Sequence, residues 1–198
     1  MCDAILFDAI EHDLSLEEIM RVAHGYRTVD TIRLVAPHLA AAEEAARFDA
    51  REAFDAEGVV GIEGAGHLLR ALAAQRWAVV TSGTRDLAVT RMRHTDLPIP
   101  PVLVTADDVA LGKPDPEAYL LAAARLNVMP ETSVVVEDAP AGIRAAHLAG
   151  MRVVALATTH RLDRLGEADA QAMHLTDIHI SPIEVESGGR LSVRVTRV

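Results

Sequence analysis

Several kinds of residue are scarce in this chain of 198 residues, and each scarcity excludes a class of protein. There is one cysteine, Cys2, so the chain can form neither an internal disulfide nor a zinc site built from cysteines. Aromatic residues make up 3% of the chain, so alanine, leucine and valine have to build the core. Lysine and arginine together number 19 against 29 aspartates and glutamates, and the formal net charge is −10. We therefore expect no nucleic-acid partner and no anionic-membrane partner, because both usually require a basic surface.

Long apolar runs are also missing. No stretch is long enough to cross a bilayer, and the N-terminal residues do not follow the pattern of a secretion signal. We expect a cytoplasmic protein that is a monomer or a weak dimer. Half of the residues are apolar, so a chain of this length can build one good core, or a core with a small appendage.

Short apolar runs alternate with segments of helical spacing along most of the chain, which predicts parallel strands connected by helices. The predicted strands are 4–7, 77–80, 102–104, 133–136 and 152–156. The predicted helices between them are 66–75, 86–94, 116–126 and 139–148. This pattern indicates an α/β fold with a three-layer, Rossmann-like parallel sheet.

Two segments depart from this alternation. Residues 14–56 are predicted to be helical throughout, and they lie between the first predicted strand and the rest of the chain. We therefore expect a reduced helical cap at 14–56, inserted after the first strand of an α/β core formed by 1–13 and 57–198. Near the C-terminus, apolar and polar residues alternate on both sides of Gly188 and Gly189, which predicts a β-hairpin.

Polar residues follow four of the predicted strands. Asp8 follows the first strand, and the stretch "TSGT" at 81–84 follows the second. Lys113 lies in "GKPDP" after the third strand, while Glu137 and Asp138 follow the fourth. Because ligands of an open parallel sheet bind beyond the carboxyl ends of its strands, we expect these side chains to share one site.

These residue types suit the chemistry of phosphate esters. Carboxylates from two strand ends form a hard oxygen site of the kind that Mg²⁺ prefers. Lys113, in a loop stiffened by two prolines, can place a positive charge beside a phosphate. The hydroxyl and N–H groups of 81–84 can bind phosphate oxygens at the start of the following helix. Asp8 is then a candidate nucleophile that forms an aspartyl-phosphate, and the expected partner is a small phosphorylated metabolite.

With these motifs in this order, the chain resembles the haloacid dehalogenase-like hydrolases, and among them the sugar-phosphatase and β-phosphoglucomutase-like group. The resemblance covers roughly residues 3–160 and is carried by four stretches: "LFD" at 6–8, "VVTSGT" at 79–84, "ALGKPDP" at 110–116 and "VVVEDAPAGI" at 134–143. It implies a Mg²⁺-dependent phosphatase that hydrolyses a small phosphomonoester, with a sugar phosphate as the expected substrate.

The resemblance also implies a role for each motif. It makes Asp8 the nucleophile and Lys113 a catalytic residue that binds the transferring phosphoryl group. Ser82 binds the same group together with Gly83, and Thr81 is the alternative hydroxyl.

The expected ligands of Mg²⁺ and of the substrate follow from the same resemblance. Asp8, Glu137 and Asp138 are the implied metal ligands. The segment "AHGYRTVDTIR" at 23–33 is similar to the cap of sugar-phosphate phosphatases. The cap residues expected to contact substrate are His24, Arg27 and Thr28.

The first motif departs from the family pattern, which has a second aspartate two residues after the nucleophile, where this chain has Ile10. In the family that aspartate protonates the leaving oxygen and later activates water. Losing a general acid/base typically costs about a hundred- to ten-thousandfold in rate. Only fifteen residues separate Asp8 from His24, which suggests that part of the cap has been deleted as well.

Three interpretations of this departure remain open. The chain could be an active hydrolase in which Glu11, His12 or Asp13 transfers the proton. It could keep the fold with strongly reduced turnover. It could also be an inactive family member that binds phosphorylated ligands without chemistry.

Most of the motifs also have a purely structural interpretation. Ser82 and Thr84 could cap the helix that follows them. Glu137 and Asp138 could be an acidic pair favoured by the dipole of the next helix. Lys113 could be an ordinary surface lysine.

Overall fold

The computed structural model describes residues 14–72, 77–183 and 190–196 of the chain. The helices of the first half are α2 (Leu16–Ala23), α3 (Thr28–Val35), α4 (Ala41–Glu52) and α5 (Ala65–Ala71). The parallel strands and the helices between them are β1 (Ala78–Val80), α6 (Arg85–His94), β2 (Val102–Val104), α7 (Glu117–Leu126), β3 (Val134–Glu137), α8 (Pro140–Leu148), β4 (Arg152–Leu156) and β5 (Ala170–Ala172). The last two strands are β6 (Ile178–Ile183) and β7 (Arg190–Val195). The strand predicted at 4–7, and Asp8 after it, lie outside the described residues.

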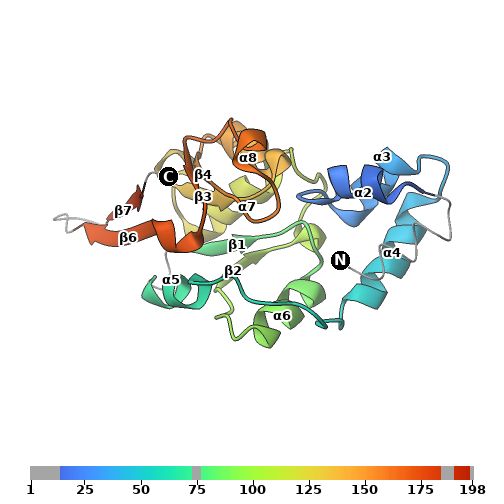
Figure 1. Ribbon diagram of the computed structural model, residues 1–198, viewed down its shortest axis with the longest axis horizontal. Helices are drawn as coiled ribbons and strands as arrows, with labels where there is room; N and C mark the ends of the chain where they lie inside the picture. Colours follow the sequence, from blue (N-terminus) through green and yellow to red (C-terminus); the bar gives the residue numbers. More distant parts are fainter. Residues whose placement is uncertain (1–13, 73–76, 184–189, 197–198) are drawn as a thin grey trace.

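Parallel pairing organises the strands of the α/β part into two sheets. β1 pairs with β2, from Ala78 opposite Val102 to Val80 opposite Val104. β4 lies between β3 and β5 and pairs in parallel with both. Figure 1 shows α7 and α8 on one side of β1 and β2, and α5 and α6 on the other. The α/β architecture with parallel sheets is therefore confirmed.

Small apolar residues build the core, as the scarcity of aromatic side chains predicts. The main cluster joins α7 and α8 to β4, and its largest fully buried members are Ile143 and Leu165. Four consecutive residues of β4, from Val153 to Leu156, are buried. A continuous apolar run of this kind is typical of a strand that is covered on both faces. This packing fixes the carboxyl ends of the strands, where the polar motifs lie.

The C-terminal hairpin is confirmed as well. β6 and β7 pair antiparallel, from Ile178 opposite Val195 to Ile183 opposite Arg190. The turn predicted at 188–189 lies outside the described residues. At the opposite end of the molecule, α2, α3 and α4 gather into a helical block (Figure 1). The three-layer arrangement, the reduced cap and the division into a core and a cap at 14–56 stay predictions.

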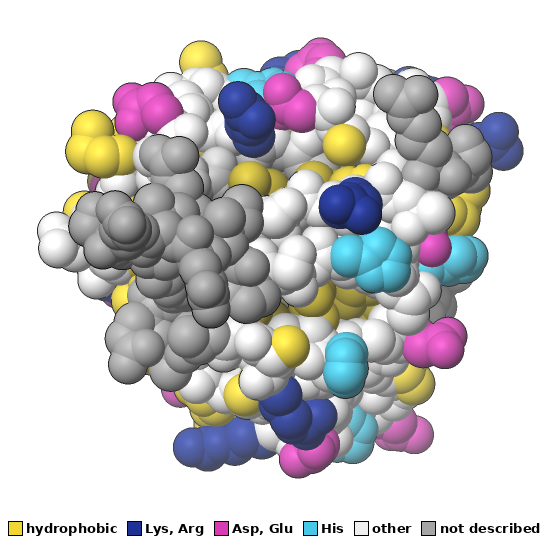
Figure 2. Space-filling view, turned by 90° about the vertical axis from the view of Figure 1, so that its left-hand side faces the viewer, with side chains coloured by type: hydrophobic (Ala, Val, Ile, Leu, Met, Phe, Trp, Pro, Cys, Tyr) yellow, Lys and Arg dark blue, Asp and Glu magenta, His cyan; other side chains and the backbone are white. Residues whose placement is uncertain are grey.

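The surface carries charges of both signs. On the face that holds the hairpin, Figure 2 shows the Lys and Arg side chains as separate islands rather than as one continuous basic area. Within the described part of the chain, no helix combines the length and the apolar character that a membrane span requires.

Candidate functional site

The carboxyl ends of β1 and β3 border a hollow of about 470 Å³. Its lining residues come from the turn after α2, the segment before α5, the end of β1 and the turn after it, the loop before α7 and the ends of β3 and β4. They are Ala23, His24, Gly25, Tyr26, Ile62, Val80, Thr81, Ser82, Gly83, Lys113, Val136, Glu137, Asp138, Leu156 and Thr158. The structure therefore brings together the predicted residues Thr81, Ser82, Gly83, Lys113, Glu137, Asp138 and His24.

The turn after β1 combines a helix cap with exposed donors. Thr84 caps α6, because its hydroxyl accepts a hydrogen bond from the backbone N–H of Leu87 at 3.4 Å. Thr81 turns back on the loop, and its hydroxyl accepts from the N–H of Gly83 at 3.1 Å. The hydroxyl of Ser82 points across the hollow and donates to the carbonyl of Gly25 at 2.8 Å. Because Thr84 caps α6, Ser82 lies just before the N-terminus of that helix. Helix N-termini bind anions favourably.

Lys113 is buried and is not a surface lysine. Its side chain is 7% exposed, and its ammonium group forms an ion pair with Oε1 of Glu137, whose side chain is 8% exposed. The ammonium also lies 5.0 Å from the centroid of the Tyr119 ring, which favours a cation. A charged side chain this deeply buried is rarely tolerated without a partner. The lysine is therefore held in one place at the wall of the hollow.

Glu137 accepts four hydrogen bonds. Besides Lys113, the hydroxyl of Tyr119 donates to Oε1 at 2.8 Å, and the backbone N–H groups of Asp138 and Ala139 donate to Oε2 at 2.9 and 3.1 Å. Burial acts to raise the pKa of Glu137, but the charge of Lys113 and these hydrogen bonds outweigh it and lower that pKa below its ordinary value. Burial, together with the charge of Glu137, raises the pKa of Tyr119. Glu137 is therefore ionised at neutral pH, while Tyr119 stays a donor.

Gly142 in α8 makes room for this carboxylate. A Cβ atom at this position would lie 1.9 Å from Oε1 of Glu137, closer than two atoms can approach. Gly142 and Glu137 both belong to the stretch "EDAPAGI". Only glycine at position 142 leaves room for the carboxylate of Glu137 that pairs with Lys113.

We expect Gly142→Ala to lower the free energy of unfolding by about 1–3 kcal/mol, the usual cost of overpacking. Alanine favours a helix interior by up to ~1 kcal/mol over glycine, but the displaced carboxylate outweighs that gain. Chemical denaturation measures the change. Gly166→Ala is the matched control, because a Cβ there meets nothing within 4 Å. Equal stability of the two variants would contradict the steric role of Gly142.

Among the described residues, Asp138 uses only one of its two carboxylate oxygens in a hydrogen bond. Its Oδ2 accepts from the hydroxyl of Thr158 at 2.7 Å, and its backbone carbonyl accepts from Thr159 at 2.9 Å. Oδ1 makes no hydrogen bond within the described part of the chain. Among the described residues there is no group of three or more His, Cys, Asp or Glu that could hold a metal ion. The predicted set of Asp8, Glu137 and Asp138 includes a residue outside this part, so it stays a prediction.

The three predicted cap residues lie in different surroundings. His24 lines the hollow, and its ring meets the ring of His160 edge-on, with 5.8 Å between the centroids. Arg27 and Thr28 do not line it. The guanidinium of Arg27 binds Asp30 and two backbone carbonyls, and the hydroxyl of Thr28 donates to Oδ1 of Asp49 at 2.7 Å. Contact of these three residues with substrate stays a prediction.

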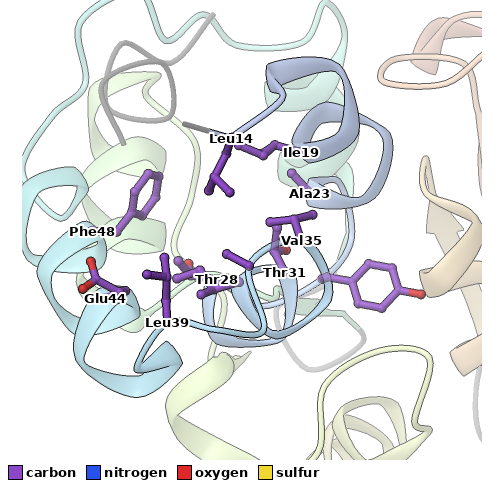
Figure 3. Close-up of a pocket in the computed structure, with 12 residues that line it drawn as sticks. Leu14, Ile19, Ala23, Thr28, Thr31, Val35, Leu39, Glu44 and Phe48 are labelled. Atoms are coloured by element: carbon purple, nitrogen blue, oxygen red, sulfur yellow. The ribbon is translucent and has the colours of Figure 1, made fainter. Parts of the chain in front are cut away.

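A second hollow lies inside the helical block. This partly open cavity of about 160 Å³ is lined by α2, α3, α4 and the segments next to them, and Figure 3 shows Leu14, Ile19, Leu39 and Phe48 directed into it. Polar atoms come from a few side chains at its edge, such as Thr28. An apolar cavity offers a phosphate group no compensation for lost hydration. The chemistry of a phosphorylated ligand therefore belongs to the first hollow.

Two residues of the site escape sequence-based reasoning. Tyr119 binds Glu137, but in the sequence it is one apolar position of a helical segment, and no signal distinguishes it. Gly142 does carry a signal, because it belongs to "VVVEDAPAGI", one of the four stretches that carry the family resemblance. Its role depends on the path of the Glu137 side chain, which the sequence does not specify.

The chain is similar to proteins of one family. The family model described as haloacid dehalogenase-like hydrolase matches residues 4–150. Hexitol phosphatase A of Escherichia coli is 38% identical over 178 residues, which cover 87% of this chain and 82% of that protein. Validoxylamine A 7'-phosphate phosphatase of Streptomyces hygroscopicus is 46% identical over 134 residues, 65% of this chain and 63% of that protein. The crystal structure of a hydrolase from Pseudomonas syringae matches with a TM-score of 0.74 and 25% identity, over 86% of this chain and 84% of that one.

Proposed function

The chain belongs to the haloacid dehalogenase-like hydrolases, within their phosphatase group, and on that premise we propose that it hydrolyses a small sugar or polyol phosphate through an aspartyl-phosphate on Asp8. The proposal rests above all on Lys113. A buried lysine is costly, and this one ends in the same hollow as Ser82 and Asp138. A phosphate group in that hollow is the ligand that such a cation and such donors fit.

In this proposal the carboxylate of Asp8 attacks phosphorus and the alcohol leaves on the opposite side. Lys113 and the hydroxyl of Ser82 bind the oxygens that gain charge in the transition state. Phosphoryl transfer is accelerated mainly by positioning and by such electrostatic stabilisation. The ion pair with Glu137 supports both effects, because it fixes the lysine before substrate arrives.

The charges of the hollow support a requirement for Mg²⁺. The charge of Lys113 is balanced by Glu137, and Asp138 adds a negative charge. Bound Mg²⁺ would supply the positive charge that offsets these carboxylates and the phosphate. Oδ1 of Asp138 fits the role of a ligand directly, with Asp8 as its predicted companion. Glu137 already accepts four hydrogen bonds and would have to release one to bind the ion.

The substrate class follows from the relatives and from the hollow. Two of the relatives are named as phosphatases, hexitol phosphatase A and validoxylamine A 7'-phosphate phosphatase. In this chain, His24 lines the hollow, and an imidazole is a group that can bind a substrate hydroxyl. Arg27 and Thr28, predicted beside it, have protein partners instead. We therefore propose His24 as the first of the cap residues to contact substrate.

A second candidate function is the binding of a phosphorylated ligand without turnover. It is favoured by Ile10, which carries no proton for the leaving group. Glu137 cannot replace the missing acid, because its lowered pKa keeps it ionised at neutral pH. The two functions predict the same ligand and differ in the fate of the phosphate ester.

Release of phosphate from hexitol phosphates and from one aryl phosphate, with and without Mg²⁺, tests the proposal. We expect metal-dependent release that disappears in Asp8→Asn. The aryl phosphate needs no proton for its leaving group, so it should give a rapid burst of one equivalent of phenol before slow turnover. Release that survives in Asp8→Asn contradicts the proposed nucleophile. A folded protein that binds phosphate and hydrolyses neither ester supports the second candidate function.

A further inference from the structure

The side chain of Arg27 joins the helical block to the loop that leads into Lys113. Arg27 directly precedes α3, and Nε of its guanidinium donates to Oδ2 of Asp30 at 2.6 Å. Its Nη1 donates to the carbonyl oxygens of Ala110 at 2.9 Å and Val109 at 3.3 Å, more than eighty residues further along the chain. The arginine side chain is only 12% exposed. The guanidinium therefore bridges two distant segments, with its own side chain largely buried and its contact to Ala110 at the exposed surface of the loop.

The same loop is held from its other side by α7. Both carboxylate oxygens of Glu117 accept backbone N–H groups, from Ala110 at 3.1 Å and from Leu111 at 2.7 Å. Ala110 is thus bound at its carbonyl by Arg27 and at its N–H by Glu117. The 109–113 loop can therefore shift little unless the hydrogen bonds of Arg27 or of Glu117 break.

Gly112 brings the bridge next to the lysine. A Cβ atom on Gly112 would lie 2.6 Å from Nε of Arg27 and 2.5 Å from Oδ2 of Asp30. The ion pair therefore packs directly on the backbone of the residue that precedes Lys113. Movement of the pair relative to the core would therefore displace Gly112, the residue bonded to Lys113.

We propose that Arg27 is a positioning residue that sets the place of Lys113 in the hollow according to the position of the helical block. Arg27 does not line the hollow, so it acts through the 109–113 loop and not on the ligand. Hydrogen bonds from a charged donor contribute more than neutral ones, and the planar guanidinium fixes their directions. The inference rests on the proposed function, in which Lys113 binds the phosphoryl group.

The test compares Arg27→Ala, Arg27→Lys and a matched control, Arg33→Ala, in the full chain. Arg33 also binds Asp30, at 3.1 Å, but it is 61% exposed and has no hydrogen bond to the loop. Three quantities are measured: the Kd for inorganic phosphate with Mg²⁺ present, the hydrogen exchange of the Ala110 and Leu111 amides, and the melting temperature.

We expect Arg27→Ala to raise the Kd for phosphate roughly tenfold, the equivalent of one charged hydrogen bond, and to speed exchange of both amides. Arg27→Lys should recover part of the affinity, and Arg33→Ala should change neither quantity. A purely structural role would lower the melting temperature in Arg27→Ala and leave the Kd unchanged, which would overturn the inference. Unchanged exchange of the two amides would overturn it as well.

Failure of the proposed function gives a different result. If the unaltered chain binds no phosphate and hydrolyses no ester, the proposed function is wrong. The exchange of Ala110 and Leu111 then still decides whether Arg27 holds the loop, because that readout needs no ligand. Faster exchange in Arg27→Ala alone supports the bridge, and equal exchange in all variants excludes it.

Discussion

Lys113→Met is expected to abolish phosphate binding and to lower the free energy of unfolding by about 3–5 kcal/mol, the usual cost of breaking a buried ion pair. The cause is Glu137, which would keep a negative charge in a site that is 8% exposed without the cation that offsets it. Methionine fills nearly the same volume as lysine, so packing contributes little to the loss. Chemical denaturation and the binding of inorganic phosphate measure the two effects separately.

The double variant Lys113→Met with Glu137→Gln provides the control. It removes both charges, and glutamine can still accept from the hydroxyl of Tyr119. We expect most of the stability to return, whereas phosphate binding stays lost because the cation is gone. Two results would contradict the role of the ion pair in stability. One is a Lys113→Met variant with the unfolding free energy of the original chain, and the other is a double variant no more stable than Lys113→Met alone.

Ile10→Asp is expected to raise kcat for a polyol phosphate by about a hundred- to ten-thousandfold, the typical contribution of a general acid/base. The new carboxyl group would give a proton to the leaving alkoxide, which is a poor leaving group, and then take one from the attacking water. The gain should be much smaller for the first step with an aryl phosphate, because a phenolate leaves without a proton. Steady-state and single-turnover kinetics on both esters measure the difference.

Ile10→Asn is the matched control, because asparagine has the size of aspartate and no proton to transfer. An equal gain in both variants would mean that the polarity of the position matters, not its acid/base chemistry. If Ile10→Asp brings no gain while the original chain hydrolyses alkyl phosphates steadily, another residue carries the proton. Glu11, His12 and Asp13 are then the residues to replace in turn.

The strands show where sequence patterns are sufficient and where they are not. The run "RVVAL" predicts a strand at 152–156, and β4 has these bounds, because a short apolar run rich in valine is typical of a strand covered on both faces. Strand β5 consists of "AQA" and has no residue that favours a strand. It exists because Val154 to Leu156 of β4 offer Ala170 to Ala172 a parallel edge to pair with. Pairing with a neighbour, not local preference, determines such a strand.

The site divides in the same way. Lys113, Glu137 and Ser82 could be predicted to lie together, because the carboxyl ends of parallel strands meet at one edge of a sheet. The partners of Arg27 could not be predicted, since they are backbone carbonyls, and every residue carries one. Which carbonyl the guanidinium reaches depends on how the segment of Arg27 packs against the 109–113 loop. The sequences of the two segments do not specify that packing.

Ser82 has a single hydroxyl proton, and that proton is given to the carbonyl of Gly25 at 2.8 Å. In the proposed reaction a phosphate oxygen requires the same proton, so the two hydrogen bonds exclude each other. If Ser82 binds phosphate as proposed, phosphate would weaken the Ser82–Gly25 contact by the same factor by which that contact weakens phosphate binding. Re-formation of the hydrogen bond to Gly25 would then favour release of the product. In the proposed reaction, release of phosphate and re-formation of the hydrogen bond between Ser82 and Gly25 would therefore be coupled.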